Sequence, residues 1–97
     1  MTPLYKILSG DFAGWRNEST GRLYDKDGNN VGYFKGVIAY SLSGYYIGEI
    51  TMSDYIGKKT AMSYPLQSSL VPYVNVALAP FADRAGMSIA GWDEPDF

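Results

Sequence analysis

The feature that most constrains this chain is an internal repeat that carries two glycines at a fixed spacing after a tyrosine. The clearest copy spans residues 23–34, with glycines at Gly28 and Gly32. A second copy follows over residues 39–50, sixteen residues later, and an earlier one covers residues 4–16. A period of about sixteen residues accommodates one β-hairpin and leaves no room for a helix beside it.

The two glycines of each copy have different expected roles. The first follows turn-prone residues, as in Asp27-Gly28, and is typical of a tight turn. The second lies inside the returning strand, where glycine indicates a bulge, a sharp bend or the close approach of another backbone. A degenerate fourth copy is read over residues 54–62, with Ala61 in place of the second glycine. The repeat therefore predicts eight short strands across residues 3–64.

The remainder of the chain, residues 65–97, departs from this pattern. Four prolines in it prevent a long helix. The apolar alternation over residues 74–78 permits one extended segment, and residues 79–84 are compatible with one helical turn. The acidic end is expected to fray beyond Trp92.

A length of 97 residues predicts a single domain, residues 1–97. One hairpin alone is marginal in water, so several must share a buried face. The predicted fold is all-β: tandem short β-hairpin repeats over residues 3–64 in a radial or barrel-like arrangement. The proline-containing segment 65–97 closes it.

Residues 23–34, followed by Gly36-Val37-Ile38-Ala39-Tyr40, resemble the tandem hairpins of bacterial proteins called four-fold β-flower proteins. Gly91-Trp92 also resembles a Gly-Trp pair near the end of such chains. The resemblance is best over residues 10–50. It implies a hairpin-repeat fold and a bacterial or phage source, and it implies no function, because the family carries no established activity.

Composition excludes several classes of function. The chain has no Cys and no His, which removes thiol nucleophiles, the commonest general base and the commonest metal ligand. The absence of disulfides from so small a domain favours a reducing, cytoplasmic compartment. The net charge of −2 argues against a nucleic-acid partner. With no long apolar run and no signal peptide at residues 1–6, we expect no membrane association, and no metal or cofactor.

Three polar features of the sequence have both a functional and a structural explanation. The run over residues 25–30 superficially resembles a calcium loop, but its glycine is misplaced and no distal Glu follows, so a hairpin turn is favoured. The paired glycines of 10–14 and 28–32 lack the following helix or Lys-Ser/Thr of a phosphate loop. Glu49 is the one acid in a confident strand, and a solvated position is favoured over a pocket.

The recurring aromatic residues are interpreted as a core layer, with a binding surface as the alternative. Arg16, Arg22 and Arg84 are the best candidates for holding an anion, with ordinary surface charge favoured over that role. A ligand site, if present, is predicted to use Trp15, Arg16, Tyr24, Tyr33, Tyr40 and Arg84.

These observations favour a non-catalytic protein-interaction module. The alternative is a binder of a small anionic or nucleotide-like ligand through aromatics and arginines. A hydrolase that uses Glu49 and a second carboxylate is a weaker third hypothesis. The apolar side chains between Leu66 and Trp92 are expected to be buried against another surface. The expected partner is a second copy of the chain, in a homodimer that uses residues 70–81. Another protein or a small ligand is the other option.

Overall fold

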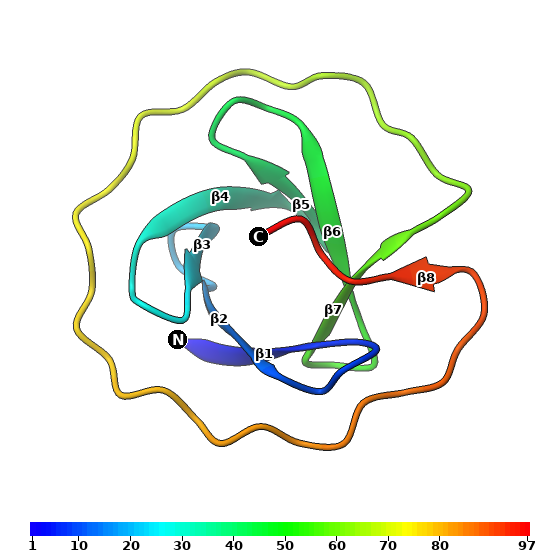
Figure 1. Cartoon of the computed structure of the whole chain (residues 1–97). Helices are drawn as coiled ribbons and strands as arrows, with labels where there is room; N and C mark the ends of the chain where they lie inside the picture. The colour runs from blue at the N-terminus through cyan, green and yellow to red at the C-terminus, as the bar shows by residue number, and fades with distance from the viewer.

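A closed barrel of seven short strands forms the body of the protein, and an extended C-terminal segment encircles it (Figure 1). The computed structural model describes residues 1–97, and the molecule is a disc of 34 × 33 × 18 Å. Its strands are β1 (Thr2–Lys6), β2 (Phe12–Asn17), β3 (Arg22–Asp25), β4 (Asn30–Lys35), β5 (Ile38–Ser41), β6 (Tyr46–Thr51), β7 (Tyr55–Lys59) and β8 (Trp92–Asp93). The all-β, barrel-like arrangement of successive hairpins that the repeat predicts is confirmed.

The barrel closes between its first and last strands. Strands β1 to β7 pair antiparallel in chain order, and β1 also pairs with β7. This last pair is parallel, with Tyr5 opposite Tyr55 and Lys6 opposite Ile56. An up-and-down barrel with an odd number of strands must have its first and last strands in the same direction. Closure removes the open sheet edges on which other chains could pair.

Aliphatic side chains of modest size fill the barrel interior. Leu4, Leu23 and Ala39 precede the tyrosine of each repeat copy and are completely buried. The tyrosines that follow them belong to two other clusters. Successive residues of a strand face opposite sides, so each apolar-Tyr pair supplies one side chain to the interior and one to the outer face.

The second glycine of each repeat permits a close approach between strands, as expected. A Cβ on Gly14 would stand 1.9 Å from the carbonyl oxygen of Tyr24, and a Cβ on Gly32 would stand 2.3 Å from that of Tyr40. The register also shifts beside the tyrosine in all three hairpins. These irregularities bend the hairpins and let so few residues close into a barrel.

The expected fourth hairpin over residues 54–62 does not form, and the prediction of eight strands within residues 3–64 is wrong by one. Only β7 lies there. Ile56 joins the interior cluster, and Gly57 follows it where the other copies have tyrosine. A Cβ on Gly57 would stand 2.9 Å from a ring carbon of Trp92, so Trp92 covers the place of the missing tyrosine ring. Strand β8 comes from the C-terminal region and pairs with β7.

Residues 61–90, which we call the belt, leave β7, pass around the outside of the barrel and return at β8 (Figure 1). The belt contains neither helix nor strand, so the expected helical turn over residues 79–84 is wrong. Contacts with the barrel replace the local bonds of a helix there. Asp83 Oδ1 accepts the backbone N–H of Phe12 at 2.7 Å, and the backbone N–H of Arg84 donates to the carbonyl oxygen of Gly10 at 2.9 Å.

Backbone N–H groups spaced three residues apart hold the belt. The donors to barrel oxygens are Gln67, Leu70, Tyr73 and Val76, followed by Arg84 and Met87. A spacing of three residues matches the three-residue turn of polyproline II and differs from the two-residue period of a strand. The prolines of the belt suit such a backbone, because they have no N–H to satisfy.

Three of these bonds end on the first glycine of a hairpin repeat. Gln67 donates to Gly44, Val76 to Gly28 and Arg84 to Gly10, each at 2.9 Å. At Gly28 the backbone φ is +84°, and an added Cβ would stand 1.9 Å from the carbonyl oxygen of Val76. The first glycine therefore makes the turn and also lets the belt lie directly on it.

The segment after β8 is ordered against the barrel, which corrects the expectation of fraying beyond Trp92. Pro95 is buried, the N–H of Asp96 donates to the carbonyl oxygen of Ile47 at 2.9 Å, and Phe97 packs against the interior cluster. This hydrogen bond keeps the end of the chain on the barrel, because the carbonyl group of β6 would be unpaired if the end were free.

The protein has no helix that is long and apolar enough to cross a membrane.

Candidate functional site

The recurring aromatic side chains lie between the barrel wall and the belt. One cluster contains Tyr5, Phe12, Trp15 and Tyr24, and a second contains Tyr33, Tyr40 and Tyr46. The belt residue Val76 packs on the first cluster and Tyr64 on the second. All seven aromatic residues of these clusters are buried, which confirms their interpretation as a core layer.

One buried tyrosine of the second cluster, Tyr33, donates a hydrogen bond to the belt. Burial raises the pKa of Tyr33, Tyr40 and Tyr46 above the ordinary value of the phenol group. The protonated Tyr33 hydroxyl donates to the carbonyl oxygen of Ser68 at 2.7 Å. The second aromatic cluster thus holds the belt by packing and also by a directed bond.

The six residues predicted to bind a ligand do not meet in one place. Trp15, Tyr24 and Arg84 lie in or beside the first cluster, where the Arg84 guanidinium stacks 3.6 Å from the ring centre of Tyr5. Tyr33 and Tyr40 belong to the second cluster. Arg16 lies apart, over the ring of Phe34 at 4.8 Å. None of the six lines any of the three surface hollows of the molecule.

Arg22 is buried, contrary to the expectation of an ordinary surface charge. Its guanidinium donates to Asn30 Oδ1 at 3.0 Å and to the carbonyl oxygen of Val71 at 2.9 Å. It also stacks 3.7 Å from the ring centre of Tyr73. Arg22 therefore joins the barrel to the belt, and no local sequence pattern predicts this role.

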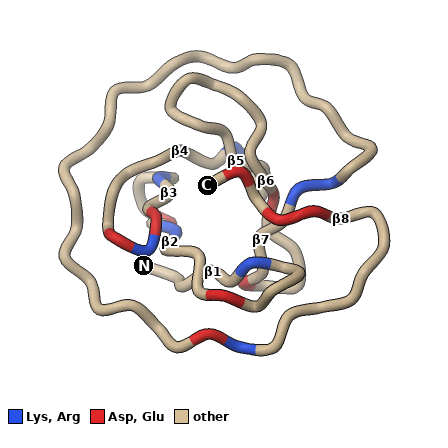
Figure 2. The backbone as a smooth tube through the Cα atoms, in the orientation of Figure 1, with Lys and Arg blue, Asp and Glu red and all other residues tan.

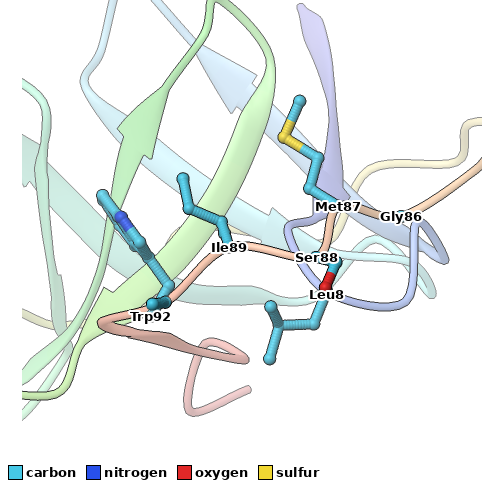
Figure 3. A pocket seen from close by; sticks show the side chains of 7 residues that line it. Leu8, Gly86, Met87, Ser88, Ile89 and Trp92 are labelled. Carbon is cyan, nitrogen blue, oxygen red and sulfur yellow. The ribbon is translucent and has the colours of Figure 1, made fainter.

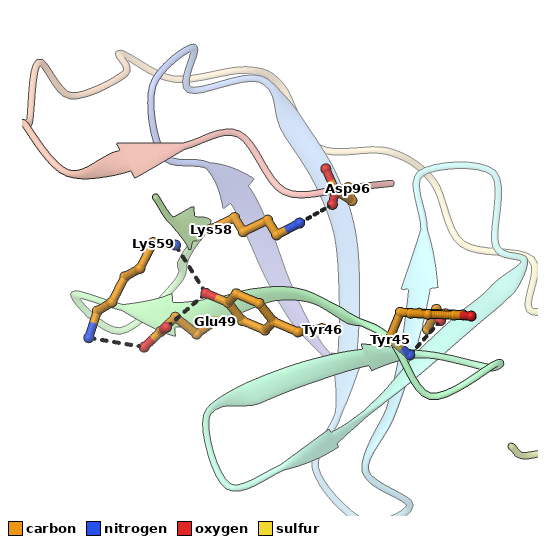
Figure 4. A network of polar contacts seen from close by, with 7 residues as sticks. Tyr45, Tyr46, Glu49, Lys58, Lys59 and Asp96 are labelled. Carbon is orange, nitrogen blue, oxygen red and sulfur yellow. Dashed lines mark hydrogen bonds and ion pairs between the residues drawn. The ribbon is translucent and has the colours of Figure 1, made fainter. Parts of the chain in front are cut away.

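Glu49 is buried as well, and the expectation that it is solvated is wrong. The Tyr46 hydroxyl donates to Glu49 Oε1 at 2.9 Å, and Lys59 Nζ lies 3.4 Å from Glu49 Oε2 (Figure 4). The Tyr46 oxygen in turn accepts the backbone N–H of Lys59 at 3.0 Å. Burial of the carboxylate is offset by this pairing, and the network joins β6 to the end of β7.

The polar run over residues 25–30 is a hairpin turn, as favoured from the sequence. Asp25 Oδ1 accepts the backbone N–H groups of Asp27 at 2.9 Å and Asn29 at 3.0 Å. The Asp25 carboxylate therefore stabilises its own turn through these bonds. The protein contains no group of three or more acidic residues placed to hold a metal ion.

The outer face of the belt is apolar and uncharged. Residues 61–82 contain no Lys, Arg, Asp or Glu, and Figure 2 shows the belt free of charge apart from the Asp83-Arg84 pair. That pair is turned to the barrel, through the bond to Phe12 and an Arg84–Asp54 ion pair at 3.1 Å. The large exposed apolar side chains of this arc are Met62, Leu66, Leu70, Val71, Tyr73, Val74, Leu78 and Phe81.

An open groove of about 650 Å³ lies where the belt returns toward β8. Leu8 of the β1–β2 turn lines it together with Met87, Ile89 and Trp92 (Figure 3). The chain departs from β7 and returns beside it at this point, so no hairpin turn fills the space.

Comparison with known proteins adds no relative. No protein-family model, curated protein or solved structure matches the chain.

Proposed function

We propose that this protein is a non-catalytic interaction module that binds other protein surfaces, first of all a second copy of itself, through the outer face of the belt. The observation that carries the proposal is the exposure of Val71 and Val74, which are 77% and 86% exposed at the middle of an uncharged arc. Contiguous apolar surface of this kind marks an interaction site on a soluble protein.

The chemistry of the belt favours a like surface as partner. A charged partner would lose water from its charges and find no counter-charge on residues 61–82. The belt of a second copy has the required character, and two copies related by a twofold axis would place the same arc on both sides of the contact. The proposed homodimer uses residues 70–81, which lie on the convex rim of the disc (Figure 1).

The other two hypotheses have less support. The six residues considered for a small anionic ligand are divided among separate clusters. Glu49 is engaged by Tyr46 and Lys59, in place of the second carboxylate that hydrolysis would require.

The proposal predicts that Val71→Glu combined with Val74→Glu converts a dimer into a monomer. Two carboxylates in the contact would have to be desolvated without partners, which costs several kcal/mol and lowers the association constant by more than about a hundredfold. Light scattering at micromolar concentration measures the mass. Val37→Glu is the matched control, because Val37 is an exposed valine of the β4–β5 turn, outside the belt. A monomeric wild-type protein, or a double variant that remains dimeric, would refute the proposal.

A further inference from the structure

The belt contacts the barrel in the same way at three places along its path, and we call each of these places an anchor point. In each, an aromatic side chain of the belt packs on the barrel, and three residues later a belt N–H donates to a first glycine. The belt aromatics are Tyr64, Tyr73 and Phe81. Their contacts are the ring of Tyr46 at 4.7 Å, the guanidinium of Arg22 at 3.7 Å and the ring of Phe12 at 5.8 Å. The anchor points follow at intervals of nine and eight residues.

The last part of the belt's path lacks such an anchor point. Eight residues after Phe81 the chain carries Ile89 and no aromatic. No fourth hairpin turn with a first glycine lies opposite it, because β7 is followed by the belt itself. The groove between Leu8 and Trp92 lies here. The groove continues the interface between barrel and belt, but the belt has no aromatic side chain to fill it.

The two charged side chains beside the groove already have partners within the chain, one through hydrogen bonds and the other through an ion pair. Glu94 accepts the backbone N–H of Leu8 at 2.7 Å and that of Ser9 at 3.2 Å. Lys59, whose ammonium lies 5.5 Å from the ring centre of Trp92, is paired with Glu49. None of the residues that line the groove is charged, and its surface combines the apolar side chains of Leu8, Ile89 and Trp92 with polar groups. A charged ligand would therefore meet no counter-charge in the lining and would be desolvated without compensation.

We infer that the groove binds an extended, uncharged segment of a partner protein through one aromatic side chain, which inserts between Leu8 and Trp92 and completes the ring of anchor points. The match in charge and the continuity with the barrel–belt interface point to this occupant. The inference rests on the proposed function in that the partner is a protein, but it uses a different surface from residues 70–81. Aromatic anchors in fitted pockets carry much of the affinity in such contacts.

The test uses a blocked peptide with the sequence of residues 71–78, which carries Tyr73 without any charge. Binding to the intact protein is followed by NMR through the indole N–H signals. Trp92 lines the groove, whereas Trp15 is 2% exposed in the first cluster and reports any disturbance of the belt. We expect a saturable shift of the Trp92 signal with the Trp15 signal unchanged. The same peptide with alanine in place of the tyrosine should bind at least about tenfold more weakly.

Leu8→Glu places a carboxylate on the wall of the groove and should weaken peptide binding at least about tenfold, while Val37→Glu should leave it unchanged. No shift in the wild-type protein, or binding that Leu8→Glu does not weaken, would overturn the inference. Movement of the Trp15 signal would also overturn it, since the peptide would then be replacing the belt. The two proposals can fail separately, because Leu8→Glu leaves residues 70–81 unchanged. The mass of the Leu8→Glu variant, measured by light scattering, therefore reports on the dimer alone.

Discussion

Gly28→Ala should lower the free energy of unfolding by about 3 kcal/mol. Alanine at a φ of +84° costs about 1 kcal/mol of backbone strain. The larger part, about 2 kcal/mol, comes from overpacking, because the new Cβ would stand 1.9 Å from the carbonyl oxygen of Val76. The belt must move away, and the hydrogen bond between Val76 and Gly28 is lost with it. Urea unfolding followed by fluorescence measures the change.

Gly91→Ala is the matched control for this prediction. Gly91 has the same φ of +84°, and an added Cβ would meet nothing within 4 Å. Its cost should therefore be the strain alone, about 1 kcal/mol. Equal losses in the two variants would show that the belt does not press on Gly28.

Trp15→Ala should destabilise the protein by about 3–5 kcal/mol, the range for removal of a large buried aromatic side chain. Trp15 is 2% exposed and packs edge-on to Phe12, with ring centres 4.8 Å apart. The cavity would open beside Phe12 and remove the support of the ring on which Phe81 of the belt stacks. Thermal and urea unfolding of the purified variant measure the loss.

The comparison variant for this prediction is Tyr45→Ala, which removes an aromatic side chain that is 63% exposed. It should change the stability by less than about 1 kcal/mol. If Trp15→Ala were as mild as Tyr45→Ala, the aromatic residues would be a surface and not the layer that joins barrel and belt.

The barrel could be predicted from the sequence because its signals are local. Apolar-Tyr pairs and two glycines recur at nearly constant spacing, and each part has a conformational reason within its own hairpin. The fourth copy was misread because Asp54-Tyr55 imitates the apolar-Tyr pair, whereas the interior position belongs to Ile56. The pairing of β7 with β6 and, at the closure of the barrel, with β1 fixes that register, with Tyr55 opposite Thr51 and Tyr5.

The belt could not be predicted because its order comes from the barrel around which it winds. Its main bonds join backbone N–H groups to backbone oxygens, so any residue except proline can make them. Its interval of eight to nine residues between Tyr64, Tyr73 and Phe81 fits neither a helix nor a strand. The buried positions of Arg22 and Glu49 were missed for a related reason. Their partners Val71 and Lys59 lie 49 and ten residues away along the chain.

Amide hydrogen exchange tests most directly whether backbone N–H groups three residues apart, in the two runs 67–76 and 84–87, fasten the belt to the barrel. We expect slow exchange at the residues whose N–H groups donate to barrel oxygens, which are Gln67, Leu70, Tyr73, Val76, Arg84 and Met87. Val74 and Asn75, which lie between two of these donors and make no such bond, should exchange at close to the rate of an open chain. Uniformly fast exchange across residues 61–90, or protection of every second residue as in a strand, would contradict the claim.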